Sequence, residues 1–187
     1  MLYAVIARPP VYGATVRGVD DSEALKVPGV ERVIAIEGKG PPAGFEPLGG
    51  VAVVATNTWA ATEGRQALKI DWNTDKAGDN AAYDTEQYRQ QLEQRAARSP
   101  GKVIRDQGDI ERALAQAESR MSATYYMPHM AQAPMEPPAA VVRLVDGGAE
   151  VWAPVQNPRA TREGVAKRLG LKPEQVTTLR RFVERGG

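Results

Sequence analysis

The segment from Thr124 to Thr178 constrains the fold of this chain more than any other part of the sequence. It contains a proline-rich loop, two short strand-like runs, a tight Val-Gln-Asn-Pro corner and an amphipathic helix. The strand and helix runs are Ala139–Val145, Ala149–Ala153 and Arg159–Leu169. This order of elements suggests a substrate or cofactor neighbourhood around the corner, with the earlier residues serving as scaffold.

The corner between the second strand and the helix carries Gln156. Asn157 is suited to cap the helix, Pro158 to begin it, and Gly170 to follow its last turn. The Gln156 amide offers two donors and an acceptor, which suits a fixed oxo or carbonyl group, and a helix N-terminus favours anions. From spacing alone, Gln156 either faces a ligand or is an ordinary corner residue.

The loop before the two strands holds the single histidine of the chain, His129, and the carboxylate of Glu136. His129 is either a structural histidine satisfied by backbone groups, or a general base or metal ligand. The lack of cysteine and of a second histidine favours the structural role. Glu136 lies between Met135 and Pro137, where a buried carboxylate needs a partner. It either belongs to a site or holds the loop to a backbone amide.

Residues 1–72 predict one compact unit with the element order β-β-α-β-β-α-β. The apolar runs Leu2–Ala7 and Val30–Ile36 are expected to be buried strands. The helix expected over Trp59–Leu68 contains Gly64, and glycine costs about 1 kcal/mol against alanine inside a helix. Either close approach of helix and sheet offsets that cost, or the glycine marks a ligand contact.

The middle of the chain predicts a polar linker followed by two surface helices. The helices are expected over Glu86–Arg98 and Ile110–Ser119, the second capped by Asp109. Short extended runs are expected at Lys102–Arg105 and Ala123–Met127.

Composition excludes several classes of protein. A formal net charge of +1 gives no electrostatic case for nucleic acid or an anionic membrane. The absence of cysteine excludes disulfides, thiol nucleophiles and cysteine-held zinc or iron–sulfur clusters within this chain. No apolar run approaches the roughly 20 residues that span a bilayer, and the first residues lack the features of a signal peptide. The common nucleotide-binding, zinc-protease and serine-hydrolase motifs are also absent from the sequence.

Three segments in this order resemble the molybdopterin-binding large subunit of molybdenum hydroxylases. They are LYAVIARPPVYGATVRGVDDSEALKVPGVERVIAI, GVAVVATNTWAATEGRQALKIDWN, and HMAQAPMEPPAA followed by EVWAPVQNPRATREGVAKRLGLKPEQV. Within that family the chain is most similar to the isoquinoline 1-oxidoreductase beta-subunit type, which is related to xanthine dehydrogenase and aldehyde oxidase. The resemblance runs from Leu2 to about Thr178. Each motif alone is weak, but the three together are specific.

The resemblance implies an α+β fold in three parts. Residues 1–73 would form an α/β hammerhead-like domain, residues 74–122 a linker with helices, and residues 123–187 the beginning of a molybdenum-cofactor-binding domain. In the family, the glutamine of a strand–turn motif approaches the molybdenum oxo group, and that position matches Gln156. The resemblance therefore makes Gln156 the predicted catalytic and cofactor-binding residue. It assigns no protein ligand to the metal and no catalytic role to His129.

The resemblance also implies an activity and a partner. The family hydroxylates N-heteroaromatic compounds or aldehydes with oxygen derived from water, using molybdopterin-bound molybdenum and a small iron–sulfur subunit, in the cytoplasm or periplasm of bacteria. After Val176 this sequence departs from the family, whose glycine-rich GGGFG loop and distal base glutamate it lacks. We therefore expect a fragment that holds no cofactor and is inactive by itself. The alternative is a non-catalytic interaction or assembly module that self-associates.

Overall fold

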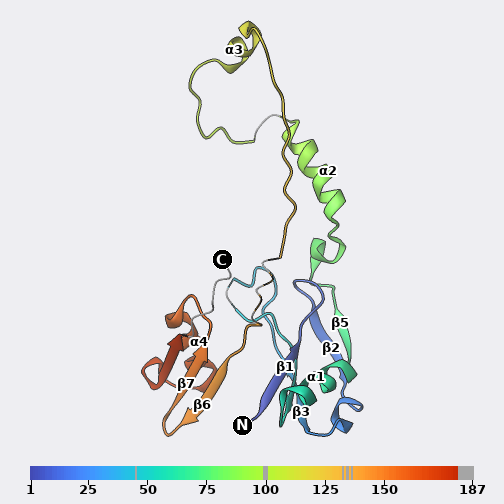
Figure 1. Cartoon of the computed structure of the whole chain (residues 1–187), viewed down its shortest axis with the longest axis vertical. Helices are drawn as coiled ribbons and strands as arrows, with labels where there is room; N and C mark the ends of the chain where they lie inside the picture. Colours follow the sequence, from blue (N-terminus) through green and yellow to red (C-terminus); the bar gives the residue numbers. More distant parts are fainter. Residues whose placement is uncertain (45, 99–100, 132, 134, 136, 181–187) are drawn as a thin grey trace. The chain divides into compact units, whose positions relative to one another are not determined.

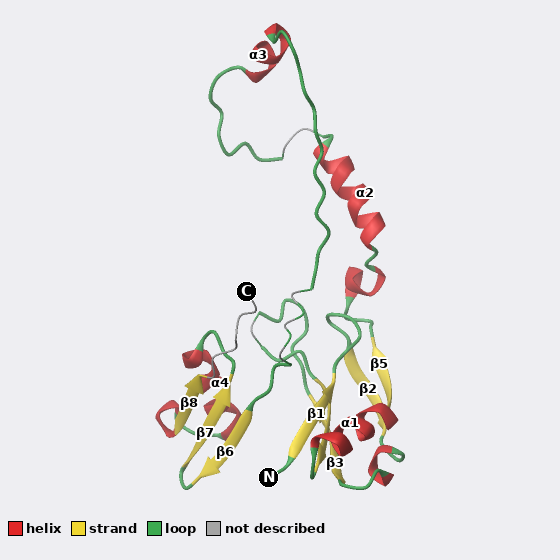
Figure 2. Cartoon of the chain, in the orientation of Figure 1, coloured by secondary structure: helices red, strands yellow, loops and turns green. Residues whose placement is uncertain are grey.

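The computed structural model describes residues 1–180 apart from 45, 99–100, 132, 134 and 136. The protein mixes helices and strands, in agreement with the predicted α+β class, and divides into two compact units, Met1–Pro128 and His129–Gly187 (Figures 1 and 2). Each unit has its own sheet structure and its own hydrophobic core.

The first unit follows the predicted order of elements, with a 3-10 turn as its first helix. Its strands and helices are β1 (Tyr3–Ala7), β2 (Thr15–Asp20), β3 (Val30–Ile36), β4 (Gly50–Ala55), α1 (Thr58–Ala67), β5 (Lys69–Asn73), α2 (Thr85–Ala96) and α3 (Ile110–Gln116). Short 3-10 helices cover Ala24–Lys26 and Gly78–Ala82.

The main sheet of the first unit has the strand order β1-β4-β3, and both pairings are antiparallel. The central strand β4 is buried at all six positions, and α1 packs against β1 and β4. β1 and β3, which we expected to be buried, are edge strands with many partly or fully exposed residues. An apolar run does not distinguish a central strand from an edge strand, because the difference depends on partners elsewhere in the chain. A separate antiparallel ribbon pairs β2 with β5.

Helix α1 approaches the sheet closely at Gly64. The helix begins after Asn57, whose side chain accepts a hydrogen bond from the Ala60 amide at 2.8 Å. A Cβ atom at Gly64 would lie 2.8 Å from Val30 Cγ2 and 2.9 Å from Val53 Cγ1. The close approach of helix and sheet is confirmed as the reason for this glycine.

Two of the predicted extended runs are not strands. Lys102–Arg105 has no regular secondary structure, and Ala123–Met127 has no ladder to another described residue. The helix caps were predicted more accurately, since Asp109 caps α3 by accepting from the Arg112 amide at 2.9 Å. A cap needs only neighbours in sequence, whereas a strand needs a second segment.

The second unit contains a three-stranded sheet with one crossover helix. Its elements are β6 (Val141–Val145), β7 (Gly148–Ala153), α4 (Pro158–Leu169), a 3-10 helix (Pro173–Gln175) and β8 (Val176–Arg180). The strand order is β6-β7-β8. β6 and β7 are antiparallel, whereas β7 and β8 are parallel. Alternate residues of β7 are buried and form a small apolar core with Ala166 of α4 and Val176 of β8.

The crowding at Gly64 leads to a direct prediction. Gly64→Ala should destabilise the first unit by about 1–3 kcal/mol, because overpacking against Val30 and Val53 outweighs the gain of about 1 kcal/mol in helix propensity. Gly164→Ala in α4 is the matched control, since a Cβ there would meet nothing within 4 Å and should stabilise its helix. Urea denaturation followed by circular dichroism measures both variants. A Gly64→Ala protein as stable as the original would contradict the close approach.

Candidate functional site

Gln156 lies in the connection from β7 to α4, two elements of the second unit that Figure 1 labels. β7 ends at Ala153 and α4 begins at Pro158, and Gln156 is an exposed residue at a bend between them. Because β7 and β8 are parallel, the backbone of Ala153 pairs with that of Arg180 at their carboxyl ends. In parallel sheets, ligands bind beyond the carboxyl ends of the strands and beside helix N-termini. The topology therefore gives Gln156 a position typical of ligand-binding residues.

The backbone on both sides of Gln156 is fixed by hydrogen bonds. Before it, the Val155 amide donates to the Ala153 carbonyl at 3.0 Å. After it, the Asn157 side chain accepts from the Ala160 amide at 3.1 Å, which caps α4 as predicted. The Gln156 side chain itself makes no hydrogen bond to another residue that the structure describes. The corner thus holds an uncommitted amide on a defined backbone.

Two further features of the corner bear on what it can bind. Pro158 has no N–H group, and the first turn of the twelve-residue helix leaves the Arg159 N–H without a hydrogen bond to a described residue. The Arg159 guanidinium turns instead to Glu163, with Nε donating to Oε1 at 2.8 Å. That hydrogen bond, followed by the charge of Glu163, raises the pKa of Arg159 above its ordinary value. The groups available here are neutral amide donors and the positive end of a helix dipole, which suit an anionic or oxo-bearing ligand.

The other residues singled out from the sequence do not join Gln156 in a described cluster. His129 is exposed in an extended part of the chain. Glu136 lies outside the described residues. In the part of the chain that the structure describes, no group of three or more His, Asp or Glu side chains gathers in a way that could hold a metal ion. None of the helices described there has the length and apolar character needed to cross a membrane.

A cavity of about 450 Å³ in the first unit was not predicted. It lies between the β1–β2 connection and the loop that follows β3, which are tied together by the Ala43 amide donating to the Tyr12 hydroxyl at 2.7 Å. Its lining residues are Arg8, Pro9, Pro10, Val11, Tyr12, Gly13, Ala14, Thr15, Gly38, Lys39, Gly40 and Leu48. Glycine and proline punctuation marked these segments as loops, but local sequence has no signal for how two loops meet.

Comparison with known proteins finds a family match that includes the corner at Gln156. Residues 95–184 match the family model described as the molybdopterin cofactor-binding domain. The whole chain also has the fold of solved molybdenum enzymes. It superposes on quinoline 2-oxidoreductase from Pseudomonas putida 86 with a TM-score of 0.59 and 16% identity, covering 99% of this chain and 27% of that one. The aldehyde oxidoreductase of Desulfovibrio gigas gives a TM-score of 0.59 and 21% identity, covering 96% and 23%.

Relatives with curated names narrow this class to one kind of subunit. The chain is 29% identical over 189 residues to the beta subunit of isoquinoline 1-oxidoreductase from Brevundimonas diminuta, covering 95% of this chain and 22% of that protein. It is 28% identical over 193 residues to a nicotinate dehydrogenase subunit of Pseudomonas putida, covering 96% and 14%. The chain is therefore a relative of the molybdopterin-binding subunits of the isoquinoline 1-oxidoreductase type, and the resemblance stated from the sequence is confirmed. It spans less than a quarter of the length of these relatives.

The cap beside Gln156 can be tested alone. Asn157→Ala should weaken the start of α4 by about 1 kcal/mol, because the Ala160 amide loses its acceptor. Hydrogen exchange of the first-turn amides of α4 should then accelerate roughly fivefold. Asn157→Ser, which retains a capping oxygen, should restore most of the protection. Equal exchange in the Asn157→Ala variant and the original protein would mean that the cap does not define this corner.

Proposed function

We propose that this chain forms part of the large subunit of a molybdenum hydroxylase and that Gln156 supplies the side-chain amide that hydrogen-bonds to the oxo ligand of the metal. The observation that carries the proposal is the exposed, uncommitted amide of Gln156 at the carboxyl end of a parallel strand pair. That corner lies inside the segment that matches the molybdopterin cofactor-binding family.

The chemistry of the corner fits such a group. The side-chain N–H of Gln156 is a neutral donor, and the N-terminus of α4 adds partial positive charge beside it. The molybdenum cofactor, when bound, supplies the redox chemistry that transfers an oxygen derived from water to a carbon atom of the substrate. The role of this chain is to orient the bound group and to stabilise the negative charge that develops on it, as preorganised donors do at oxyanion sites. It contributes no predicted metal ligand and no predicted base.

We also propose the domain boundaries expected from the resemblance. Residues 1–73 would be the hammerhead-like domain, residues 74–122 a linker with helices, and residues 123–187 the first part of the molybdopterin-binding domain. The mixed unit built on β1-β4-β3 and α1 supports the first assignment. The division of the chain into compact units after Pro128 lies six residues beyond the proposed boundary at 122.

We infer the substrate class of the assembled enzyme from the names of the relatives, and its partner from the family resemblance. Isoquinoline and nicotinate, which appear in the names of two relatives, are N-heteroaromatic compounds. We propose that the assembled enzyme hydroxylates an N-heteroaromatic compound or an aldehyde. Its electrons would pass to a small iron–sulfur subunit, as the resemblance to molybdenum hydroxylases implies.

A second candidate function is that of a non-catalytic interaction or assembly module. The observation that favours it is a series of large apolar side chains in the middle of the chain that are strongly exposed. They include Val103, Ile104, Ile110, Met121, Tyr125, Met127, Met130 and Met135, each at least 64% exposed. Exposed large apolar side chains, where they form a contiguous patch, mark protein–protein or membrane interaction sites. This function does not require Gln156.

The chain by itself should hold no stoichiometric molybdenum and should turn over no substrate. The reason is its extent, since it spans only 14–22% of two curated relatives, whose remaining residues would complete the cofactor site. Elemental analysis of chain purified from cells that synthesise the cofactor tests this. One molybdenum atom per chain would contradict the expectation.

The role of Gln156 is testable in an assembled enzyme, with this chain replacing the matched region of the Brevundimonas diminuta protein. Gln156→Ala should lower kcat by about tenfold to a hundredfold, because a hydrogen bond to a charged or oxo group contributes roughly 1.5–3 kcal/mol. Gln116→Ala at the end of α3, which changes another exposed glutamine, should leave kcat unchanged. A Gln156→Ala enzyme with full activity would refute the assigned role.

A further inference from the structure

The stretch from Ser119 to Pro128 is an extended chain without a sheet partner. It contains no helix, turn or bridge after a single bend at Glu118, and its backbone makes no backbone hydrogen bond to another described residue. The aromatic and apolar character of Ala123–Met127 predicted a strand from sequence. The stretch therefore has the residue types of a strand, but no ladder to another described residue.

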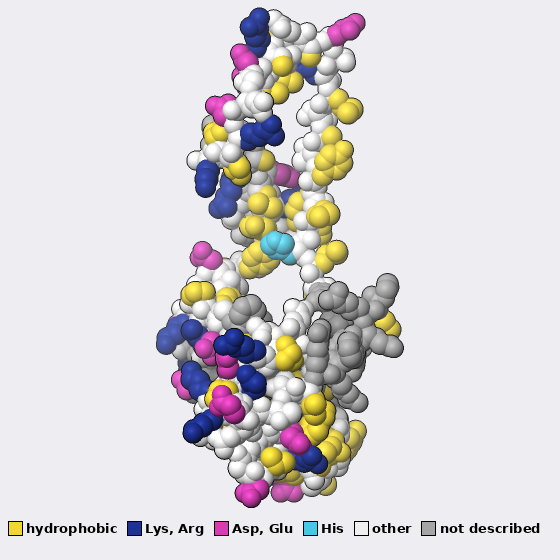
Figure 3. Space-filling model, turned by 90° about the vertical axis from the view of Figure 1, so that its left-hand side faces the viewer, with side chains coloured by type: hydrophobic (Ala, Val, Ile, Leu, Met, Phe, Trp, Pro, Cys, Tyr) yellow, Lys and Arg dark blue, Asp and Glu magenta, His cyan; other side chains and the backbone are white. Residues whose placement is uncertain are grey.

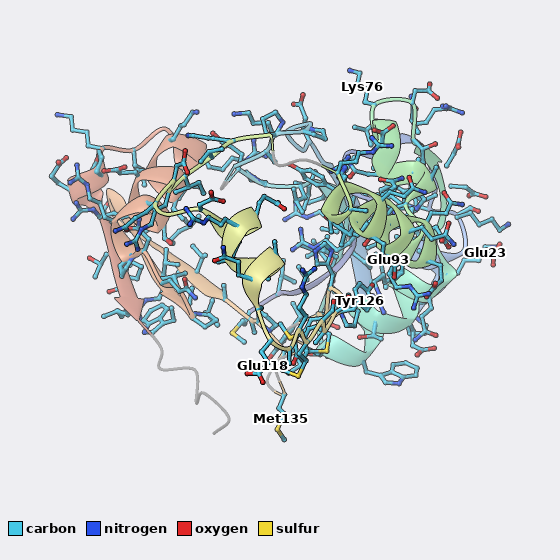
Figure 4. The ribbon with its side chains drawn as sticks, turned by 90° about the horizontal axis from the view of Figure 1, so that it is seen from above. Glu23, Lys76, Glu93, Glu118, Tyr126 and Met135 are labelled. Carbon is cyan, nitrogen blue, oxygen red and sulfur yellow. The ribbon has the colours of Figure 1, made fainter. Side chains whose placement is uncertain are left out.

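Every residue of this stretch is exposed, but three consecutive side chains differ in how far. Tyr125 and Met127 are 91% and 88% exposed, whereas Tyr126 between them is 40% exposed. Tyr126 points to α2, where the Arg89 guanidinium carbon lies 5.9 Å from its ring centroid (Figure 4). Successive side chains of an extended chain point to opposite sides. Tyr126 thus contacts α2, and in an extended chain its neighbours Tyr125 and Met127 point to the opposite side.

Two features of this stretch call for a partner. Apolar side chains follow one another along the extended part of the chain in the space-filling view (Figure 3). The backbone of residues 119–128 makes no backbone hydrogen bond to another residue that the structure describes, and such a backbone is the template that an edge strand offers to another strand. A single extended segment is not stable as a strand in water, so both features call for a second segment. Strand addition satisfies both at once, by a hydrogen-bonded ladder and by burial of alternate side chains.

The lengths of the relatives bear on where that second segment lies. The stretch lies inside the matched family segment of residues 95–184, so it belongs to the region that this chain shares with molybdopterin-binding subunits. The match to the Brevundimonas diminuta protein takes in 95% of this chain but only 22% of that protein. The larger part of such a subunit is therefore polypeptide that this chain does not contain.

We infer that residues 119–128 pair as a β-strand with a sheet edge in the part of the large subunit that lies outside the region matched by this chain. Tyr125 and Met127 are the apolar anchors of that interface, and the side carrying Tyr126 remains against α2. The choice of partner rests on the proposed function, but the pairing requires neither molybdenum nor Gln156.

The test uses the chain together with a defined partner, the Brevundimonas diminuta protein from which the 189 matched residues are deleted. The two are co-expressed without molybdenum, and a tag on the partner recovers the complex. The chain should co-purify, and the amides of residues 121–127 should exchange with solvent on the order of a hundredfold more slowly than in the chain alone. Because the readout is binding and exchange, it is independent of the activity test on Gln156.

Two variants distinguish strand pairing from non-specific hydrophobic association. Tyr125→Pro removes a backbone donor and an anchor, and should lower the affinity at least about tenfold. Ile104→Pro is the matched control, because Ile104 is 93% exposed in an irregular segment outside the stretch and should leave the affinity unchanged. Failure to co-purify would overturn the inference, as would a complex in which these amides still exchange freely. Protection that appears in the chain alone as its concentration rises would overturn it in favour of pairing between two copies.

Discussion

The parallel pairing of β7 with β8 determines where the second unit can bind a ligand. Parallel strands cannot be joined by a tight turn, so the chain must cross back over the sheet, and α4 makes that crossover. Ala149, Val151 and Ala153, the buried residues of β7, pack in one core with Ala166 of the helix. As a consequence, the end of one strand, the start of the helix and the end of the neighbouring strand all lie at one edge. Gln156 lies at that edge because it belongs to the connection between β7 and α4, and this position does not depend on the function of its side chain.

The sequence predicted those features that depend on neighbours along the chain. The caps at Asn157 and Asp109 were read from residue type and position, and both side chains accept the expected amide hydrogen bonds. Gly170 ends α4 in the left-handed region, with a φ of 67° that glycine adopts without strain. For Gly64 the sequence left close packing and a ligand contact open, and the structure supports the packing.

Features that depend on distant parts of the chain were not predicted. The centre and the edges of the first sheet could not be told apart, since β4 and its neighbours have similar apolar content. The cavity next to Tyr12 arises where two loops meet, and the sequence of neither loop predicts contact with the other. For the candidate site, Gln156 had an alternative interpretation from spacing alone, and the family resemblance was what singled it out. Its hydrogen-bonding potential was readable from the sequence, but its exposure and its place beside a parallel strand were not.

The hydrogen bonds that fix the chain before and after Gln156 have a thermodynamic consequence. The Val155 and Ala160 amides are already engaged, so the corner has a defined backbone before any ligand arrives. The conformational entropy of ordering this loop is lost during folding and not during association. A group that binds here then meets a preorganised surface and immobilises little more than one glutamine side chain. Tight recognition can therefore come from few contacts. A change that loosens the first turn of α4 would weaken binding even if every contacting residue were retained.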